Sequence, residues 1–224
     1  MSVVVFDLES DSTFRAFAGA ARDLRFKRMQ VTVGCALVLN AELCRGPDPA
    51  AALAKGTHHS FWRDVAEEGQ DPFEGLLRLF DAAEVIVGYN AGDFDFPLLQ
   101  KHYGCKGGGR YLSHRMKLLD PFEKLKAATG VWIKLDDLLV ANAIPQKTGN
   151  GLEAIRLWEE GKRDELQAYC TYDVIALARL CLLRQLRVPC VGVVAPGPVF
   201  SIAAALAAAR EGEVERDSES FVLV

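Results

Sequence analysis

The chain starts with an apolar strand that runs directly into two carboxylates. Residues 3–6 (VVVF) are β-branched or aromatic, and Asp7, Leu8 and Glu9 follow them at once. Side chains alternate along a strand, so Asp7 and Glu9 share one face of it. Two adjacent carboxylates repel each other, and such a pair at a buried strand end implies a cation between them. We therefore expect a core strand that delivers metal ligands at its carboxyl end.

A second acidic motif follows another short apolar run. Residues 85–87 (VIV) predict a buried strand, and the motif at 90–95 (NAGDFD) comes directly after it. Residues 97–103 then predict a helix that is closed by Gly104. The motif thus stands at a strand-to-helix junction, where α/β folds present the residues of their sites.

A third motif lies on the longest helical pattern of the chain, which runs from about residue 163 to 186. Its apolar stripe consists of Leu166, Cys170, Val174, Leu177 and Cys181. Tyr169 and Asp173 are four residues apart and therefore lie on the same side of the helix. They are one step round from the stripe, which places both at the edge of the buried face.

The remaining pattern predicts strands that alternate with helices. We expect further strands at 31–39 (VTVGCALVL), near 60–62 and at 116–119. We expect helices at 72–83 with Asp71 as N-cap, at 121–129 ending at Gly130, and at 135–143, 152–160 and 201–210. The stretches 106–110 (KGGGR) and 146–151 (QKTGNG) predict loops.

Length and composition favour one globular domain with an appendage. The 224 residues are half apolar, which is enough for one sizeable core. We place the domain at 1–187 and a C-terminal extension at 188–224, because the character of the chain changes around Pro189. The extension carries no chemical signature. It is either a partner-binding or self-associating appendage or a segment that packs over the core.

The net charge of −4 argues against binding nucleic acid through bulk positive charge. Local contact stays open, because basic residues form two clusters that are either solvated surface or face a substrate. One cluster is Arg22, Arg25, Lys27 and Arg28, and the other is Lys101, Lys106, Arg110, Arg115 and Lys117.

The cysteines and the N-terminus indicate where the protein resides. The six cysteines show no C-x-x-C pairing and mostly lie in apolar stretches, which predicts reduced core thiols. The N-terminus lacks a basic segment, and Asp7 and Glu9 interrupt its apolar run, so a signal peptide is not expected. No apolar stretch of ~20 residues is free of charges or helix breakers, so no membrane span is expected either. We expect a soluble, intracellular protein.

Together the three motifs resemble those of the DEDD superfamily of 3′-to-5′ exonucleases, which includes the proofreading domains of family B DNA polymerases. Each motif alone is weak evidence of function, but the order of the three motifs and their expected positions on strand, junction and helix match those of the superfamily over roughly residues 3–185. The first motif is matched by Asp7 and Glu9, the second by Asn90, Phe94 and Asp95, and the third by Tyr169 and Asp173. The match is to the tyrosine subclass, since Ala168 stands where the histidine subclass has its histidine.

The resemblance implies an α/β, RNase H-like fold with a mixed sheet flanked by helices, and hydrolysis with two metal ions. By that resemblance Asp7 would bridge the ions, Glu9 and Asp173 would complete the site that activates water, and Asp95 would hold the second ion. Tyr169 would orient the attacking water, because a phenol is a poor base at neutral pH. Oxygen ligands favour Mg²⁺ or Mn²⁺. The substrate would be the 3′ end of single-stranded DNA or RNA, and the product 5′-mononucleotides.

Four residues are candidates for substrate binding, namely Ser10, Asn90, Phe94 and Lys147. Ser10 either touches the terminal nucleotide or is an ordinary strand-end hydroxyl. Phe94 either packs beside the site or contacts a base. Lys147 either helps a helix N-terminus to hold a phosphate or lies in a turn before an Asn150 cap.

Two neighbours compete with the motif residues, and other functions compete with the nuclease. Asp93 and Tyr172 are alternatives to Asp95 and Tyr169, although the motif spacing favours the latter. A catalytically silent nucleic-acid-binding or scaffold protein on the same fold is the main rival. A metabolic α/β enzyme is disfavoured because neither G-x-G-x-x-G nor G-x-x-x-x-G-K-[ST] occurs. An RNase H-type endonuclease has a similar acidic cluster, but the late Y-x-x-x-D indicates cleavage from an end.

Overall fold

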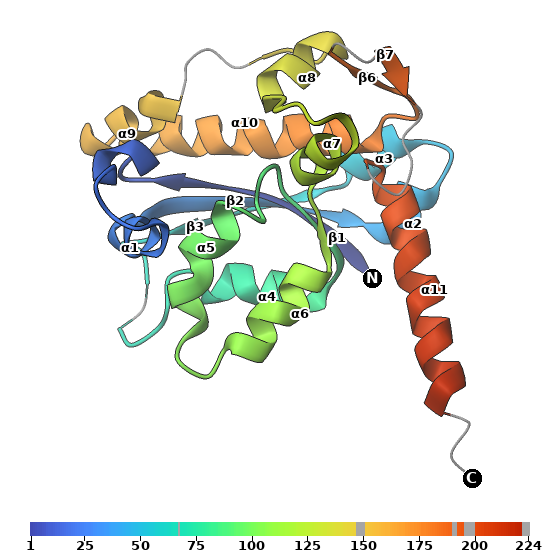
Figure 1. Ribbon diagram of the computed structural model, residues 1–224, viewed down its shortest axis with the longest axis horizontal. Coiled ribbons are helices and arrows are strands. Elements are labelled where there is room, and N and C mark those ends of the chain that lie inside the picture. Colours follow the sequence, from blue (N-terminus) through green and yellow to red (C-terminus); the bar gives the residue numbers. More distant parts are fainter. Residues whose placement is uncertain (67, 147–150, 190–191, 195–199, 221–224) are drawn as a thin grey trace.

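A mixed five-stranded sheet forms the centre of the molecule (Figure 1). The computed structural model describes residues 1–66, 68–146, 151–189, 192–194 and 200–220. The strand order is β3-β2-β1-β4-β5, in which β1 runs antiparallel to β2 and parallel to β4. The strands are β1 (Ser2–Ser10), β2 (Val31–Asn40), β3 (Thr57–Trp62), β4 (Ala83–Val87) and β5 (Leu118–Leu119). Helices cover both faces, so the predicted α/β architecture is present.

The alternation of side chains along β1 separates two hydrophobic layers. Val3 and Val5 are fully buried in the layer beneath the long helix α10 (Arg163–Leu182). Val4 and Phe6 are buried in the opposite layer, with α4 (Glu74–Ala82). The strand is central and apolar on both faces, which explains the unbroken apolar run at 3–6. The same alternation turns Asp7 and Glu9 toward α10.

The connection between β1 and β2 folds into helices of its own. It contains the 3₁₀ helix η1 (Phe14–Phe17) and α1 (Arg22–Arg28). The two strands still pair directly, from Ser2 opposite Asn40 to Glu9 opposite Val33, and the register shifts only at Ser10. The helical connection therefore sits at the carboxyl end of β1, next to the acidic residues (Figure 1).

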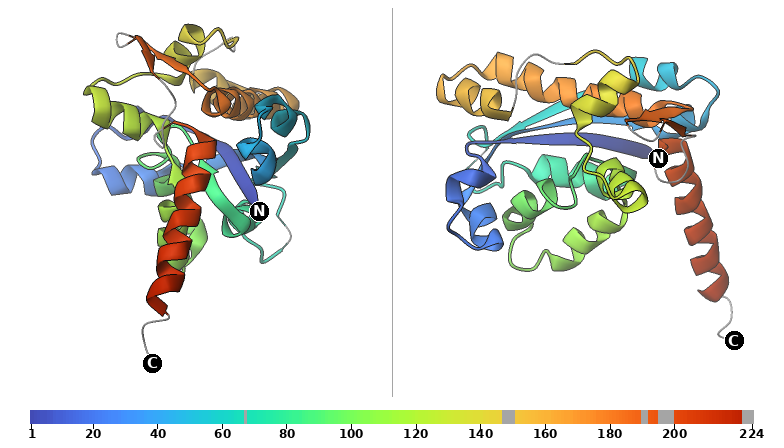
Figure 2. Two further views of the ribbon diagram at one scale, coloured as in Figure 1. Left: turned by 90° about the vertical axis from the view of Figure 1, so that its right-hand side faces the viewer. Right: turned by 45° about the horizontal axis from the view of Figure 1, so that its top comes forward.

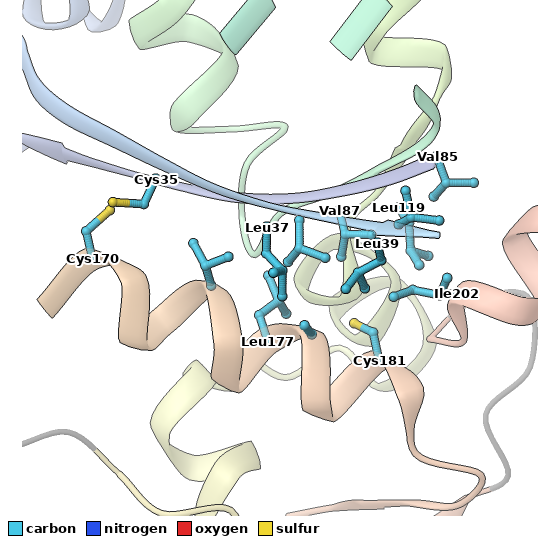
Figure 3. Packing of buried hydrophobic residues seen from close by; sticks show 14 of the residues in the cluster. Cys35, Leu37, Leu39, Val85, Val87, Leu119, Cys170, Leu177, Cys181 and Ile202 are labelled. Carbon is cyan, nitrogen blue, oxygen red and sulfur yellow. The ribbon is translucent and has the colours of Figure 1, made fainter. Parts of the chain in front are cut away.

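Each face of the sheet carries its own set of helices. Ala154 of α9, Ala41 of α2 and Ala52 of α3 are buried in the same layer as α10. Figure 3 shows Leu177 and Cys181 of α10 packed on the sheet in this layer. The helices of this face are α2 (Ala41–Arg45), α3 (Pro49–Ala54), α9 (Gly151–Glu159) and α10. The opposite layer contains α4, α5 (Asp95–Leu99), η2 (Gln100–Tyr103) and α6 (Gly108–Met116).

A third, smaller cluster lies on the outer side of α10. Leu138 and Leu139 of α8 pack there with Leu180 of α10 and with Leu186 and Val188. The cluster joins α7 (Pro121–Thr129), α8 (Leu135–Ala141) and the ribbon of β6 (Leu186–Val188) with β7 (Gly192–Val194). The left view of Figure 2 shows α8 and the ribbon of β6 and β7 above α10, on the side away from the sheet.

Several predicted boundaries are corrected by the structure. The stretch 106–110 is not a loop throughout, because Gly108 begins α6. The long helix ends at Leu182, and Leu186 belongs to β6 instead. The last helix, α11 (Ile202–Ser220), extends well beyond the predicted 201–210 and projects from the body of the molecule (Figure 1). The turn-rich stretch at 146–151 falls mostly outside the described residues.

The thiols are mostly buried, as predicted. Cys35, Cys44, Cys170 and Cys181 are free and buried, whereas Cys105 is exposed and is no core residue. In the part of the chain that the structure describes, no helix is both long enough and apolar enough to cross a bilayer.

Candidate metal centre

A cavity of about 270 Å³ opens where β1, α5 and α10 meet. It is lined by all five residues proposed for chemistry together with their neighbours: Asp7, Leu8, Glu9, Tyr89, Asn90, Phe94, Asp95, Leu135, Asp136, Tyr169 and Asp173. Residues separated by more than 160 positions in the sequence therefore lie at one place.

Three elements deliver the acidic side chains from different directions. β1 presents Asp7 and Glu9 toward α10, and α10 presents Tyr169 and Asp173, one turn apart, toward the strand. Asp95 is the first residue of α5 and is buried, with 5% of its surface exposed. The strand-to-helix junction thus brings the second motif up to the first, which is the position predicted from the sequence.

Negative charge is concentrated around Asp95. Its pKa is raised well above the usual value, first by burial and then by the charges of Asp7 and Asp120. Hydrogen bonding to the backbone of Leu8 acts in the opposite direction but does not cancel the effect. A carboxyl in this setting is stabilised as the anion when a cation shares the cavity.

The ligand atoms at the end of β1 are close enough to hold one ion. Oxygens of Asp7 and Glu9 and the Cys170 sulfur all lie within 4.8 Å of one another. The Cys170 sulfur is 3.4 Å from the Asp7 carbonyl oxygen and 3.6 Å from Asp7 Oδ2. Burial raises the pKa of this thiol well above its usual value, and the neighbouring Cys35 adds to the effect. The neutral thiol therefore donates toward Asp7, which leaves the carboxylate oxygens of Asp7 and Glu9 as the anionic donors of this group.

Asp120 was not identified from the sequence, yet it shapes the loop of the second motif. Its carboxylate is 2% exposed and accepts hydrogen bonds from the backbone amides of Asn90 (2.9 Å) and Gly92 (3.0 Å). The same carboxylate caps α7 by accepting from the amide of Phe122 at 3.0 Å. Asn90 has a positive φ of 58°, so the loop needs such support to keep its turn. The sequence signal was present but local: an Asp followed by Pro121 at a helix start.

The competing acid and tyrosine are engaged elsewhere. Asp93 is exposed and pairs with Arg22, whose Nη2 lies 3.3 Å from Asp93 Oδ1. The Tyr172 hydroxyl donates to the carbonyl oxygen of Pro145. Neither residue lines the cavity, whereas Asp95 and Tyr169 do.

Three further lining residues had no signal in the sequence. Tyr89 donates to the Ile133 carbonyl oxygen at 2.5 Å and so ties the second motif to the segment before α8. That contact brings Leu135 and Asp136 to the rim of the cavity. Burial raises the pKa of Tyr89, so its phenol stays neutral and keeps this hydrogen bond at all ordinary pH values.

The candidate substrate-binding residues fall in different places. Asn90 and Phe94 line the cavity itself. Ser10 lines a neighbouring hollow of about 590 Å³, and its hydroxyl donates to the Ser12 carbonyl oxygen at 2.9 Å. That local hydrogen bond agrees with the interpretation of Ser10 as an ordinary hydroxyl at the end of a strand. Lys147 lies outside the described residues.

The chain is similar to known proteins in its fold and not in its sequence. No protein-family model matches the chain, and no curated protein matches it. Among solved structures it is similar to the family B DNA polymerase from the hyperthermophilic archaeon Pyrobaculum calidifontis, with a TM-score of 0.51 and 16% identity. The match covers 92% of this chain and 27% of the polymerase chain, so this chain spans a small part of that protein's length. The predicted RNase H-like α/β fold class is confirmed.

Proposed function

We propose that the protein is a metal-dependent 3′-to-5′ exonuclease that releases 5′-mononucleotides from single-stranded nucleic acid. The observation that carries this proposal is the convergence of Asp7, Glu9, Asp95 and Asp173 with Tyr169 on one cavity. Four carboxylates from three elements have no structural need to meet, and their mutual repulsion makes the arrangement costly without cations. We place this activity in residues 1–187 and treat 188–224 as an extension.

The residues of the cavity fit a pair of divalent ions. The donors are carboxylate oxygens, which suit Mg²⁺ or Mn²⁺, and the raised pKa of buried Asp95, caused by burial and by nearby negative charge, indicates a local excess of that charge. Asp7 lies near Glu9, and its charge acts on Asp95, so it would help to hold both ions, with Glu9 and Asp173 at one and Asp95 at the other. When bound, the ions supply Lewis acidity that activates water and stabilises the leaving oxygen.

The protein's own groups orient the reaction. Tyr169 is one helical turn from Asp173 and lines the same cavity, where its phenol is placed to hydrogen-bond the attacking water. A neutral phenol is too weak a base to remove the proton, so its contribution is position. Phe94 and Leu8 form apolar walls beside the acids and give the terminal nucleotide a surface to lie against.

The decisive experiment uses 5′-labelled single-stranded DNA and RNA of one sequence, each with and without Mn²⁺. We expect a metal-dependent ladder that shortens from the 3′ end on at least one substrate, and no ladder with Asp173→Asn. The substrate that is shortened also reports the sugar preference. Internal cleavage, or no cleavage of either substrate, would overturn the proposal.

Two variants separate the roles of the residues, and this is our first prediction. Asp7→Asn is expected to weaken Mn²⁺ binding and to lower turnover at least about 100-fold, because it removes a shared ligand. Tyr169→Phe is expected to lower turnover about 10²-fold with Mn²⁺ affinity intact, because only the orientation of water is lost. The checks are isothermal titration with Mn²⁺ and single-turnover rates.

The matched control is Asp93→Asn, which removes an acid from the same motif but from an exposed position outside the cavity. It is expected to keep Mn²⁺ affinity and turnover. Equal loss of metal affinity in Asp7→Asn, Tyr169→Phe and Asp93→Asn would contradict the assigned roles.

A further inference from the structure

The connection between β1 and β2 is locally basic in an acidic chain. Residues 12–30 carry five cations, Arg15, Arg22, Arg25, Lys27 and Arg28, against one carboxylate, Asp23. The whole chain has a net charge of −4. A positive region of this kind attracts polyanions only where it is exposed, so the placement of the individual side chains decides its use.

Two of these arginines hold the connection in shape. Arg25 donates to the carbonyl oxygens of Ala20 and Ala18, both at 2.8 Å, and so ties α1 to the segment after η1. Arg22 donates to the Asp93 carbonyl oxygen at 2.7 Å. Since Asp93 belongs to the second motif, α1 is anchored directly to the loop that carries Asp95.

The other three cations are free to meet a ligand. Arg15, Lys27 and Arg28 are exposed, and none of them has an ion-pair partner among the described residues. Lys27 borders a hollow of about 440 Å³ between α1 and Pro97, near the start of α5. Arg28 borders a second hollow, of about 430 Å³, on η1 and the turn that follows it. Exposed cations beside surface hollows suit anionic groups that approach from solvent.

One of these cations, Arg15, borders the candidate metal centre directly. The hollow that contains Arg15 also contains Glu9 and Phe94, both of which line the cavity of the acids. The Phe26 ring on the buried side of α1 lies 5.9 Å, edge to face, from the Phe94 ring. In Figure 1, η1 and α1 lie beside the end of β1 and close to α5. A strand whose 3′ end enters the cavity therefore has this surface next to it.

We propose that the exposed cations of η1 and α1, namely Arg15, Lys27 and Arg28, bind the phosphates of single-stranded nucleic acid upstream of the 3′ end. This inference rests on the proposed function, because these cations would contact the strand whose 3′ end lies in the proposed active site. A single strand fits better than an acidic protein, since Arg15 shares a hollow with Glu9 and Phe94 of the cavity for which we propose phosphate chemistry. The surface contributes affinity for long substrates and takes no part in the reaction.

The test compares two double variants with the same change in charge. Lys27→Gln with Arg28→Gln neutralises the proposed surface. Lys55→Gln with Arg187→Gln neutralises two exposed cations, one directly after α3 and one in β6, at the opposite end of the molecule (Figure 1). Glutamine keeps helix propensity close to that of lysine and arginine, so α1 should persist in the first variant. Lys55 and Arg187 are exposed and lie outside helices, so the fold should persist in the second as well, and thermal melting checks both.

Binding of a fluorescein-labelled 20-nucleotide single strand is measured by anisotropy between 50 and 300 mM KCl, and turnover is measured on the same strand and on a trinucleotide. Each lost phosphate contact lowers the salt slope of a single-strand complex by ~0.7, so the α1 variant should lose ~1.4. Its affinity for the long strand should fall about tenfold or more at 100 mM salt. Turnover of the trinucleotide should stay unchanged, and the Lys55/Arg187 variant should behave as wild type.

The outcomes separate this inference from the proposed function. Equal affinity and salt slope in the α1 variant and wild type, with the 3′ ladder intact, would overturn the inference and leave the exonuclease standing. Binding that depends on Lys27 and Arg28 without any ladder would support the surface and overturn the exonuclease. Neither binding nor a ladder on DNA or RNA would overturn both.

Discussion

Asp120 stabilises the loop that carries the second motif of the candidate site. It accepts hydrogen bonds from two backbone amides of the second motif and from the first turn of α7, although it does not line the cavity. Burial raises the pKa of this carboxyl, and the backbone hydrogen bonds only partly offset the effect. The residue is therefore a positioning residue, which acts through the loop that carries Asn90 and Asp95.

Asp120→Ala is expected to weaken both the fold and metal binding. The amides of Asn90 and Gly92 lose their acceptor, which costs about 1–3 kcal/mol of the free energy of unfolding. The displaced loop should lower Mn²⁺ affinity about 10- to 100-fold, as loss of an outer-shell partner typically does. Urea unfolding and Mn²⁺ titration measure the two effects.

Asp120→Asn serves as the conservative comparison. Its single carbonyl oxygen replaces one acceptor but not both, so stability and Mn²⁺ affinity should lie between those of wild type and Asp120→Ala. A loss of stability with Mn²⁺ affinity fully retained in the folded fraction would show that Asp120 has no positioning role.

At the scale of elements, ion pairs with α4 help to stabilise α6. The helix begins with Gly108 and Gly109, each of which disfavours a helix by about 1 kcal/mol relative to alanine. Arg110 offsets part of this cost by pairing with Glu74 (2.9 Å) and Asp81 (2.6 Å), both in α4. The helix is therefore stabilised by a neighbour that is distant in sequence, which the glycine-rich stretch does not reveal.

Arg110→Gln should destabilise the protein at neutral pH by about 1 kcal/mol, a modest value because the pairs are partly exposed. Hydrogen bonds from Arg110 lower the pKa of Glu74. In Asp81 burial alone would raise the pKa, but the hydrogen bonds from Arg110 and His114 together lower it. Carboxyls with lowered pKa contribute stability above their unfolded pKa of about 4 and lose it as the pH falls through the folded value. The difference between wild type and variant should therefore shrink as the pH falls below about 4, and it should vanish once both carboxyls are protonated in the folded protein.

The control is Arg78→Gln, which removes the other arginine that pairs with Glu74. Arg78 is 76% exposed on the side chain, so its loss should change the free energy of unfolding by less than ~0.5 kcal/mol at any pH. Urea unfolding from pH 3 to pH 8 provides the comparison. A wild-type-minus-Arg110→Gln difference that grows toward low pH would contradict the argument.

At the scale of the whole molecule, the C-terminal extension shares the core of the sheet. Ile202 and Leu206 at the start of α11 are fully buried in the cluster that holds Val3 and Leu177. Figure 3 shows Ile202 reaching the residues between the sheet and α10. Farther along, Arg210 pairs with Glu42 of α2 at 2.7 Å. The first turns of α11 therefore belong to the folded body.

Leu206→Ala is expected to lower the free energy of unfolding by about 3 kcal/mol, because it leaves a cavity in that shared core. Unfolding should remain a single transition, since the extension and the sheet are stabilised by the same contacts. Leu112→Ala is the control on α6, where Leu112 is 62% exposed, and should change stability by less than ~0.5 kcal/mol. Two separate transitions would show that α11 folds independently. Equal effects of the two variants would contradict the burial of Leu206 in the shared core.

Local patterns were sufficient for much of the fold. The alternation along 3–9 correctly predicted a core strand with Asp7 and Glu9 on one face, because period two is a property of the chain itself. The helix at 121–129 has the predicted bounds, since Pro121 begins it and Gly130 ends it with a positive φ of 73°. The order of the three acidic motifs also predicted their meeting, through a resemblance that carries tertiary information.

The tertiary structure decided the features that depend on contacts between distant segments. The ion pairs of Arg110 stabilise α6, pairing with β7 makes 186–188 a strand, and the start of α11 is buried in the core. The hydrogen bonds of Asp120 and the approach of Leu135 and Asp136 to the cavity likewise join segments about 30 residues or more apart in sequence. Periodicity and capping describe free energies within a few turns of chain, whereas these features draw their stability from partners that only the folded chain brings together.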